Sequence, residues 1–267
     1  PGPYWFNSVI MDSAFEKLFF SSGTSGSNPS RHYVKDTSWY EMSFTRGFEL
    51  AYGKPGKYCI LALLPSYLER EDSSLVYMVK KLIEKSKHPD SDFYLHDLNA
   101  LKDKLLKLES LHQPSILIGV SFALLDLAEK FSFRLKNTII METGGMKGRR
   151  DEITRRELHA ILQSRFGLEK IHSEYGMTEL FSQAYSKMKG LFRFPPWAKI
   201  FIRDVYDPFT FVEEGRNGGI NVIDLANVYS CAFIETKDLG RIVEGNIFEV
   251  SGRFDHSDIR GCNLMSI

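Results

Sequence analysis

The residues best suited to chemistry lie in a loop rich in serine, threonine and glycine near the start of the chain. It reads Ser21-Ser22-Gly23-Thr24-Ser25-Gly26-Ser27-Asn28-Pro29-Ser30-Arg31. Glycines let backbone N–H groups turn toward an anion, hydroxyls add hydrogen-bond donors, and an arginine adds positive charge. The combination predicts a phosphate-binding loop, and the alternative is an ordinary polar surface loop. The Gly-Lys-Ser/Thr ending of P-loop NTPases is absent, which disfavours that class.

A second group of residues with chemical potential is Tyr175-Gly176-Met177-Thr178-Glu179. An aromatic ring can stack on a base, a threonine hydroxyl can bind a phosphate oxygen, and a carboxylate can hold Mg²⁺. The alternative is a strand-to-helix turn that contains a buried tyrosine.

Charged and glycine-rich segments complete the set of candidate residues. Carboxylates lie beside guanidinium groups in two segments, Glu235-Thr236-Lys237-Asp238-Leu239-Gly240-Arg241 and Gly252-Arg253-Phe254-Asp255. The alternative interpretation is that these are solvated charges on β-turns. Thr143-Gly144-Gly145-Met146-Lys147-Gly148 follows a predicted strand, and such strand-end loops bind ligands in open α/β sheets.

Short β-leaning apolar runs alternate with amphipathic stretches, which predicts an α/β fold with parallel strands and crossover helices. The strongest helix spans 152–166, with Asp151 as N-cap and Gly167 at its end. Its predicted buried face holds Leu158, Ile161, Leu162 and Phe166. The other predicted strands are 17–20, 58–64, 115–119, 137–141 and 170–172, and the other predicted helices are 35–52, 73–85, 98–108 and 121–131.

From about Pro195 onward the pattern changes to short β-rich segments separated by glycine and asparagine turns. It predicts an antiparallel subdomain with strands near 197–203, 219–223, 230–234 and 247–250.

Composition narrows the function classes. The 267 residues carry 34 basic and 34 acidic side chains, so charge does not favour nucleic acid as a partner. Cys59, Cys231 and Cys262 form no C-x-x-C pair, which favours a reducing, cytoplasmic location. The longest apolar stretches are shorter than a membrane-spanning helix requires. Histidine spacing suggests no metalloenzyme, and there is no G-x-S-x-G elbow of a serine hydrolase.

Taken in order, these segments resemble the signatures of the acyl-adenylate-forming superfamily: S-S-G-T-T-G-x-P-K, Y-G-x-T-E, T-G-D and G-R-x-D. The chain departs from them by one extra residue before Pro29, by Arg31 in place of lysine and by Lys237 in place of glycine. The resemblance implies ATP and Mg²⁺ as cofactors. It assigns phosphate binding to Ser22, Gly23, Thr24, Ser25, Gly26 and Arg31. Thr178 would bind the α-phosphate and Glu179 would hold Mg²⁺. The adenine and ribose would contact Gly144, Gly145, Tyr175 and Gly176, and the ribose hydroxyls would bond to Asp238 and Arg253.

The resemblance also implies a domain organisation. Residues 1–252 would form a layered αβαβα core of mainly parallel sheets, with the β-rich subdomain at about 195–252. Residues 253–267 would form a hinge and tail, without the mobile lid of longer members.

The sequence looks most like the short branch that contains the acyl-protein synthetases of bacterial bioluminescence. In that branch a C-terminal cysteine, matched here by Cys262 beside Arg260, accepts the acyl group as a thioester. The implied function is activation of a carboxylic acid, in this branch a fatty acid, followed by transfer to a protein thiol. A reductase or carrier protein would be the partner. The alternatives are a phenylacetate-type aryl-CoA ligase and a nucleotide-binding or partner-binding module without turnover.

Overall fold

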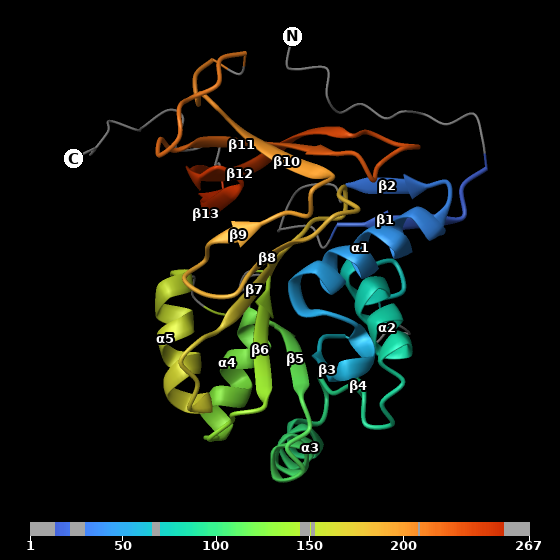
Figure 1. Ribbon diagram of the computed structural model, residues 1–267, viewed down its shortest axis with the longest axis vertical. Helices are drawn as coiled ribbons and strands as arrows, with labels where there is room; N and C mark the ends of the chain where they lie inside the picture. The colour runs from blue at the N-terminus through green and yellow to red at the C-terminus, as the bar shows by residue number, and fades with distance from the viewer. Residues whose placement is uncertain are drawn as a thin grey trace.

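Eleven strands form one mixed sheet in the computed structural model, which describes residues 14–21, 30–65, 70–144, 150, 153–207 and 209–253 (Figure 1). Their order is β10-β11-β12-β13-β9-β8-β7-β6-β5-β3-β4. The α/β class is thereby confirmed. Among the described residues, no helix has both the length and the apolar character needed to cross a bilayer.

One half of the sheet is parallel and carries the helices. Its strands are β3 (Cys59–Leu63), β4 (Asp92–Phe93), β5 (Ser115–Val120), β6 (Thr138–Thr143) and β7 (His172–Tyr175). The helices are α1 (Thr37–Tyr52), the short 3-10 helix η1 (Pro55–Lys57), α2 (Ser74–Ser86), α3 (Leu98–Ser110), α4 (Ser121–Lys130) and α5 (Arg155–Phe166). Figure 1 shows α1 and α2 on one side of these strands and α4 and α5 on the other.

The other half of the sheet is antiparallel, as the sequence predicts for the C-terminal region. Its strands are β8 (Ala184–Ser186), β9 (Phe192–Arg193), β10 (Ala198–Arg203), β11 (Gly218–Asp224), β12 (Phe233–Glu244) and β13 (Ile247–Arg253). The strand predicted over 230–234 instead begins at Phe233, and it is longer than predicted because it pairs with both β11 and β13.

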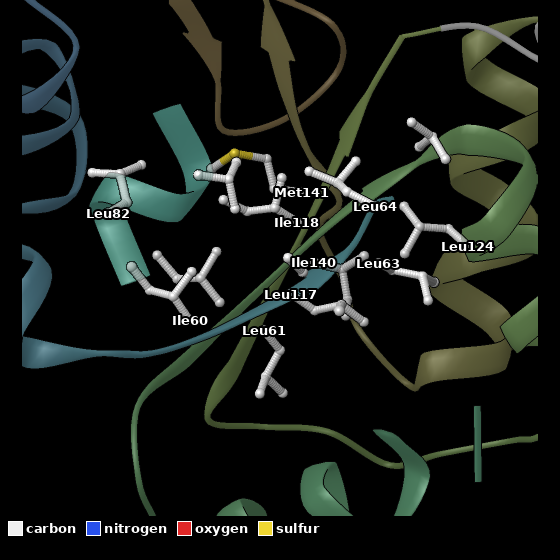
Figure 2. Close-up of a cluster of buried hydrophobic side chains, with 14 of the residues drawn as sticks. Ile60, Leu61, Leu63, Leu64, Leu82, Leu117, Ile118, Leu124, Ile140 and Met141 are labelled. Atoms are coloured by element: carbon white, nitrogen blue, oxygen red, sulfur yellow. The ribbon is translucent and has the colours of Figure 1, made fainter. Parts of the chain in front are cut away.

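The core lies between the parallel strands and the helices. Every residue of β3 and β5 is buried, as expected for strands covered on both faces. Figure 2 shows Ile60 and Leu117 from these strands beside Leu82 of α2 and Leu124 of α4. Each such side chain contributes about 1.5–3 kcal/mol when fully buried, so this packing fixes the ends of the strands where the candidate residues lie.

Helix α5 begins later than predicted. Its N-cap is Thr154, whose hydroxyl accepts a bond from the Glu157 N–H at 3.2 Å, while the Glu157 carboxylate accepts one from the Thr154 N–H at 2.8 Å. This capping box satisfies two backbone donors together, which a single aspartate cannot do. Asp151 lies outside the described residues. Gly167 ends the helix in the left-handed conformation, as predicted, but Ile161 is 40% exposed and does not share the buried face.

Two strands near the candidate motifs differ from the prediction. The strand predicted over 170–172 is instead β7, because hydrogen bonds to β6 and β8 extend it through Tyr175. A further strand, β2 (Arg31–Val34), was not predicted; it pairs with β1 (Lys17–Phe20) in a separate antiparallel hairpin. The predicted phosphate-binding loop, between Ser21 and Arg31, therefore joins two strands and does not lead directly into a helix.

Candidate functional site

The hairpin of β1 and β2 holds the two ends of the Ser/Thr/Gly segment together. The Ser21 N–H donates to the Ser30 carbonyl at 3.0 Å, and the Ser30 N–H donates to the Ser21 hydroxyl at 2.9 Å. Phe20, the last residue of β1, lines a cleft of about 160 Å³. The segment between these ends contains Ser22, Gly23, Thr24, Ser25 and Gly26, which lie outside the described residues.

Arg31 lies at the start of β2 with an exposed side chain. Its guanidinium carbon is 5.9 Å from the centre of the Phe20 ring, so the charge lies beside the residue that borders the cleft. The arginine is thus held near the cleft by a strand and not by a helix.

The cleft brings together candidate residues from separate segments of the sequence. Gly144 follows β6, whereas Gly176 and Thr178 follow β7, and all three line the cleft. Since β6 and β7 are parallel neighbours, their C-terminal ends meet at one edge of the sheet. Gly144 adopts the left-handed conformation and its carbonyl accepts the Ser121 hydroxyl at 2.5 Å. Gly145 lies outside the described residues.

Thr178 is positioned by a residue that the sequence did not single out. The Thr178 carbonyl is 2.7 Å from Nδ1 of His32, a buried residue of β2, and Nε2 of the same ring is 2.9 Å from the Ser230 hydroxyl. Burial lowers the pKa of His32 and so favours the neutral ring. Because a carbonyl oxygen can only accept, Nδ1–H is the donor in this bond. The ring therefore connects the β1–β2 hairpin to the segment that carries Thr178.

The residues after Thr178 are held by two buried side chains from β11 and the turn that follows it. Asn227 donates to the Glu179 carbonyl at 2.8 Å. The Asp224 carboxylate accepts the N–H groups of Phe181 and Ser182 at 2.8 Å each. Glu179 itself is half-buried, so its carboxylate remains available at the end of this segment.

Tyr175, Asp238 and Arg253 form one cluster, although they come from three different strands. The Tyr175 phenol donates to Oδ2 of Asp238 at 2.7 Å, and Nε of Arg253 lies 3.2 Å from Oδ1. Burial is the main cause of a raised pKa at both Tyr175 and Asp238. The Tyr175 ring also packs against Phe192, with 5.9 Å between ring centres.

Lys237 does not interfere with this cluster. Neighbouring residues of a strand point to opposite faces, and Lys237 is exposed while Thr236 and Asp238 are buried. The lysine in place of the usual glycine therefore leaves the Asp238 side of β12 unchanged. Cys262 and Arg260 lie outside the described residues, as do Phe254 and Asp255.

Two further polar residues line the cleft and were not identified from the sequence. Glu174, on β7, is 7% exposed and accepts the Thr143 hydroxyl at 2.5 Å. Burial raises the pKa of its carboxyl to about 7. Gln183 is 4% exposed, and its Oε1 is buried without a hydrogen-bond partner in the described structure. Glu174 could have been identified from the sequence by its position immediately before Tyr175, the first residue of the Tyr175–Glu179 motif.

His172, which the sequence left open as a substrate contact or a core residue, is not among the cleft-lining residues. Its Nδ1 is 3.2 Å from the Tyr52 hydroxyl, and burial lowers its pKa to about 4. It is a half-buried histidine that is hydrogen-bonded to Tyr52. Within the described ranges, no group of three or more histidine, cysteine, aspartate or glutamate side chains is arranged to hold a metal ion.

Comparison with known proteins identifies the fold. No family model and no curated protein matches the sequence. Among solved structures, ATP-bound MatB from Rhodopseudomonas palustris matches with a TM-score of 0.65 at 15% identity, over 88% of this chain and 47% of that one. The O-succinylbenzoate coenzyme A synthetase from Bacillus subtilis, in complex with ATP and magnesium, matches with a TM-score of 0.60 at 18% identity, over 88% and 49%.

A third match is the A-PCP structure of McyG complexed with phenylalanyl-adenylate, with a TM-score of 0.60 at 17% identity, over 88% of this chain and 46% of that one. The fold is that of the large domain of adenylate-forming enzymes. The chain spans about half the length of the solved structures that it matches.

Proposed function

We propose that this protein is an adenylate-forming ligase, which uses ATP to activate a carboxylic acid as an acyl-adenylate and then transfers the acyl group to a thiol. The observation that carries the proposal is the convergence of the motif residues. Tyr175, Asp238 and Arg253 form one hydrogen-bonded cluster, and Gly176, next to Tyr175, opens onto the cleft that Thr178 also lines. The matching fold supports the same function.

The Asp238 cluster suits the ribose of ATP. A carboxylate has about four acceptor positions, and the bonds from Tyr175 and Arg253 use only two of them. A ribose diol supplies two donors for the remaining positions. Tyr175 and Arg253 would fix the orientation of the carboxylate before the nucleotide binds, which lowers the cost of ordering it.

Adenylation requires positioning and charge more than proton transfer. A carboxylic acid with a pKa of about 4 is already ionised at neutral pH and attacks the α-phosphorus without a base. We assign the α-phosphate to the Thr178 hydroxyl, because the His32 bond holds that segment against the cleft. Arg31 and the loop of Ser22, Gly23, Thr24, Ser25 and Gly26 would bind the departing pyrophosphate.

Glu179 would hold Mg²⁺. Magnesium in nucleotide sites takes one or two carboxylates and completes its shell with phosphate oxygens and water, so a single half-buried glutamate fits this role without a cluster of protein ligands. When bound, Mg²⁺ neutralises phosphate charge. The chain's contribution is to fix the backbone on either side of Glu179, through Asn227 and Asp224.

We propose Cys262 as the acyl acceptor, as in the acyl-protein synthetases, and a reductase or carrier protein as the next acceptor. Cys59 is unsuitable because burial raises the pKa of its thiol to about 11. Cys59 and Cys231 are free thiols, which supports a reducing, cytoplasmic location. Fatty and aryl acids are both candidate substrates, and coenzyme A is the alternative acceptor.

Acid-dependent exchange of pyrophosphate into ATP tests the proposed function. Asp238→Asn should raise the KM for ATP, and Glu179→Gln should lower kcat, each by tenfold or more. The control is Glu244→Gln, which alters an exposed carboxylate at the end of β12 and should leave exchange unchanged. ATP binding without exchange for any acid would contradict the enzyme proposal and favour a nucleotide-binding module.

The acceptor is tested by incubating the protein with ATP and a radiolabelled acid that supports exchange. A hydroxylamine-sensitive label should form on the protein, disappear in Cys262→Ser and persist in the matched variant Cys231→Ser. A label that persists in Cys262→Ser, or one that forms only on added coenzyme A, would contradict the assignment of Cys262.

A further inference from the structure

Arg155, the first residue of α5, contacts three strands where the parallel and antiparallel halves of the sheet meet. Its Nε–H donates to Oε1 of Glu142 on β6 at 3.1 Å, and a terminal N–H donates to the Val250 carbonyl on β13 at 3.1 Å. The guanidinium carbon lies 5.0 Å from the centre of the Phe192 ring on β9. Because Glu142 is only 4% exposed, the ion pair is anchored in the core. One side chain thus joins the two halves of the sheet.

The bond to Val250 lies beside an irregularity in β13. Val250 and Gly252 pair with consecutive residues of β12, which leaves Ser251 as one extra residue on β13. A β-bulge of this kind interrupts the hydrogen-bond ladder locally. On the other edge of β13, the pairing with β9 extends no further than Phe248 in the described part of the chain. Arg155 therefore supports β13 where its pairing is interrupted on one edge and has ended on the other.

Both of these contacts lead to the cluster of Tyr175, Asp238 and Arg253. Arg253 lies on β13 beyond the bulge, three residues after the carbonyl that Arg155 holds, and it pairs there with Asp238 of β12. The Phe192 ring beneath the guanidinium packs against Tyr175, with 5.9 Å between ring centres. The three members of the cluster thus come from strands that Arg155 holds or that pair with those strands.

We propose that Arg155 is a positioning residue for the nucleotide, which fixes the cluster of Tyr175, Asp238 and Arg253 in the orientation that binds the ribose. This inference rests on the proposed function, which assigns the ribose to Asp238. A cluster that is already ordered loses less conformational freedom when the ligand binds. The planar guanidinium suits this role because it donates in two fixed directions at once, which a lysine ammonium on its flexible stem does not.

Pyrophosphate exchange at varied ATP and acid concentrations separates positioning from general structural damage. Arg155→Ala should raise the KM for ATP at least fivefold, with kcat and the KM for the acid within twofold of the wild type. A merely structural role would reduce the active fraction, and hence kcat, and would leave the KM for ATP unchanged. Arg155→Lys, which keeps a positive charge beside Glu142, should raise it two- to fourfold. The exposed neighbour provides the control, Arg156→Ala, which should leave it unchanged.

A second measurement follows the cluster without any nucleotide. Tyr175→Phe should lower the midpoint of urea denaturation, because it removes the donor to Asp238. If Arg155 holds the cluster, this shift should fall to half or less in the Arg155→Ala background, since contacts within one network are not additive. The shift should keep its full size in the Arg156→Ala background.

The outcomes separate this inference from the proposed function. An unchanged KM for ATP in Arg155→Ala, or in Arg155→Lys if the alanine variant does not fold, overturns the inference and leaves adenylation standing. If the wild type supports exchange with no acid, adenylation is contradicted, and the Kd for ATP of the same variants, measured by calorimetry, decides the inference under the same limits. A wild type that binds no ATP overturns the ribose assignment and the nucleotide role of Arg155 together. Equal shifts from Tyr175→Phe with and without Arg155 overturn the inference whatever the nucleotide results.

Discussion

Replacement of Glu174 by glutamine is expected to stabilise the protein at pH 8 much more than at pH 5. The Glu174 carboxyl is buried, and its pKa rises from 4.5 to about 7 on folding. The folded protein thus binds this proton more tightly than the unfolded chain does. The stabilisation is fully present below about pH 4.5 and is lost as the pH rises through 7.

The magnitude follows from the size of the pKa shift. At about 1.4 kcal/mol per pKa unit, a shift from 4.5 to about 7 corresponds to a loss of about 3 kcal/mol of wild-type stability across the whole window. Most of that loss, about 2.5 kcal/mol, falls between pH 5 and pH 8. Glutamine has no proton to lose, and its carbonyl can still accept the bond from Thr143.

Urea denaturation of both proteins at pH 5, 6, 7 and 8 measures this difference directly. The free energy of unfolding of Glu174→Gln, relative to the wild type, should increase by about 2.5 kcal/mol from pH 5 to pH 8, which corresponds to about 5–10 °C in Tm. Glu244→Gln, an exposed carboxylate, should follow the wild-type curve. Parallel curves for Glu174→Gln and the wild type would refute the reasoning and show that water reaches the Glu174 carboxyl.

Three further predictions concern the site and its support. Tyr175→Phe removes the donor to Asp238 and should lower the free energy of unfolding in urea by about 1.5–3 kcal/mol; a loss below 0.5 kcal/mol would show that water replaces the phenol. Gly176→Ala should cost about 1 kcal/mol, because Oε1 at the end of the Glu174 side chain must shift to make room for the new Cβ. Gly252→Ala meets nothing within 4 Å and should change stability little; equal effects would contradict the close approach. Thr154→Ala breaks the capping box of α5 and should cost about 1 kcal/mol in thermal denaturation, and an unchanged Tm would show that another group caps the helix.

The sequence by itself determined the elements that depend on local patterns. The apolar runs at 58–64 and 115–119 became β3 and β5, because a fully buried strand needs only a short continuous apolar stretch. Gly167 marked the end of α5 through its tolerance of the left-handed conformation. The order of the motifs also indicated an adenylate-forming fold, which the solved structures support.

Local patterns failed where pairing between distant segments decides the structure. β2 has only four residues, too few for their alternation to mark a strand, and it is held by hydrogen bonds to β1. β7 extends to Tyr175 because β6 and β8 flank it on both sides. Strand boundaries of this kind depend on the partner strand as much as on propensity.

Only the tertiary structure decided which side chains form the site. Tyr175 and Asp238 are separated by 63 positions, and His32 and Thr178 by 146, yet each pair is in hydrogen-bonding contact. The environment of Glu174 is likewise a tertiary property, since its raised pKa arises from burial by neighbours that are distant in the sequence. Sequence patterns identify residue types and local conformation, whereas burial, pairing and pKa depend on how the chain packs around each group.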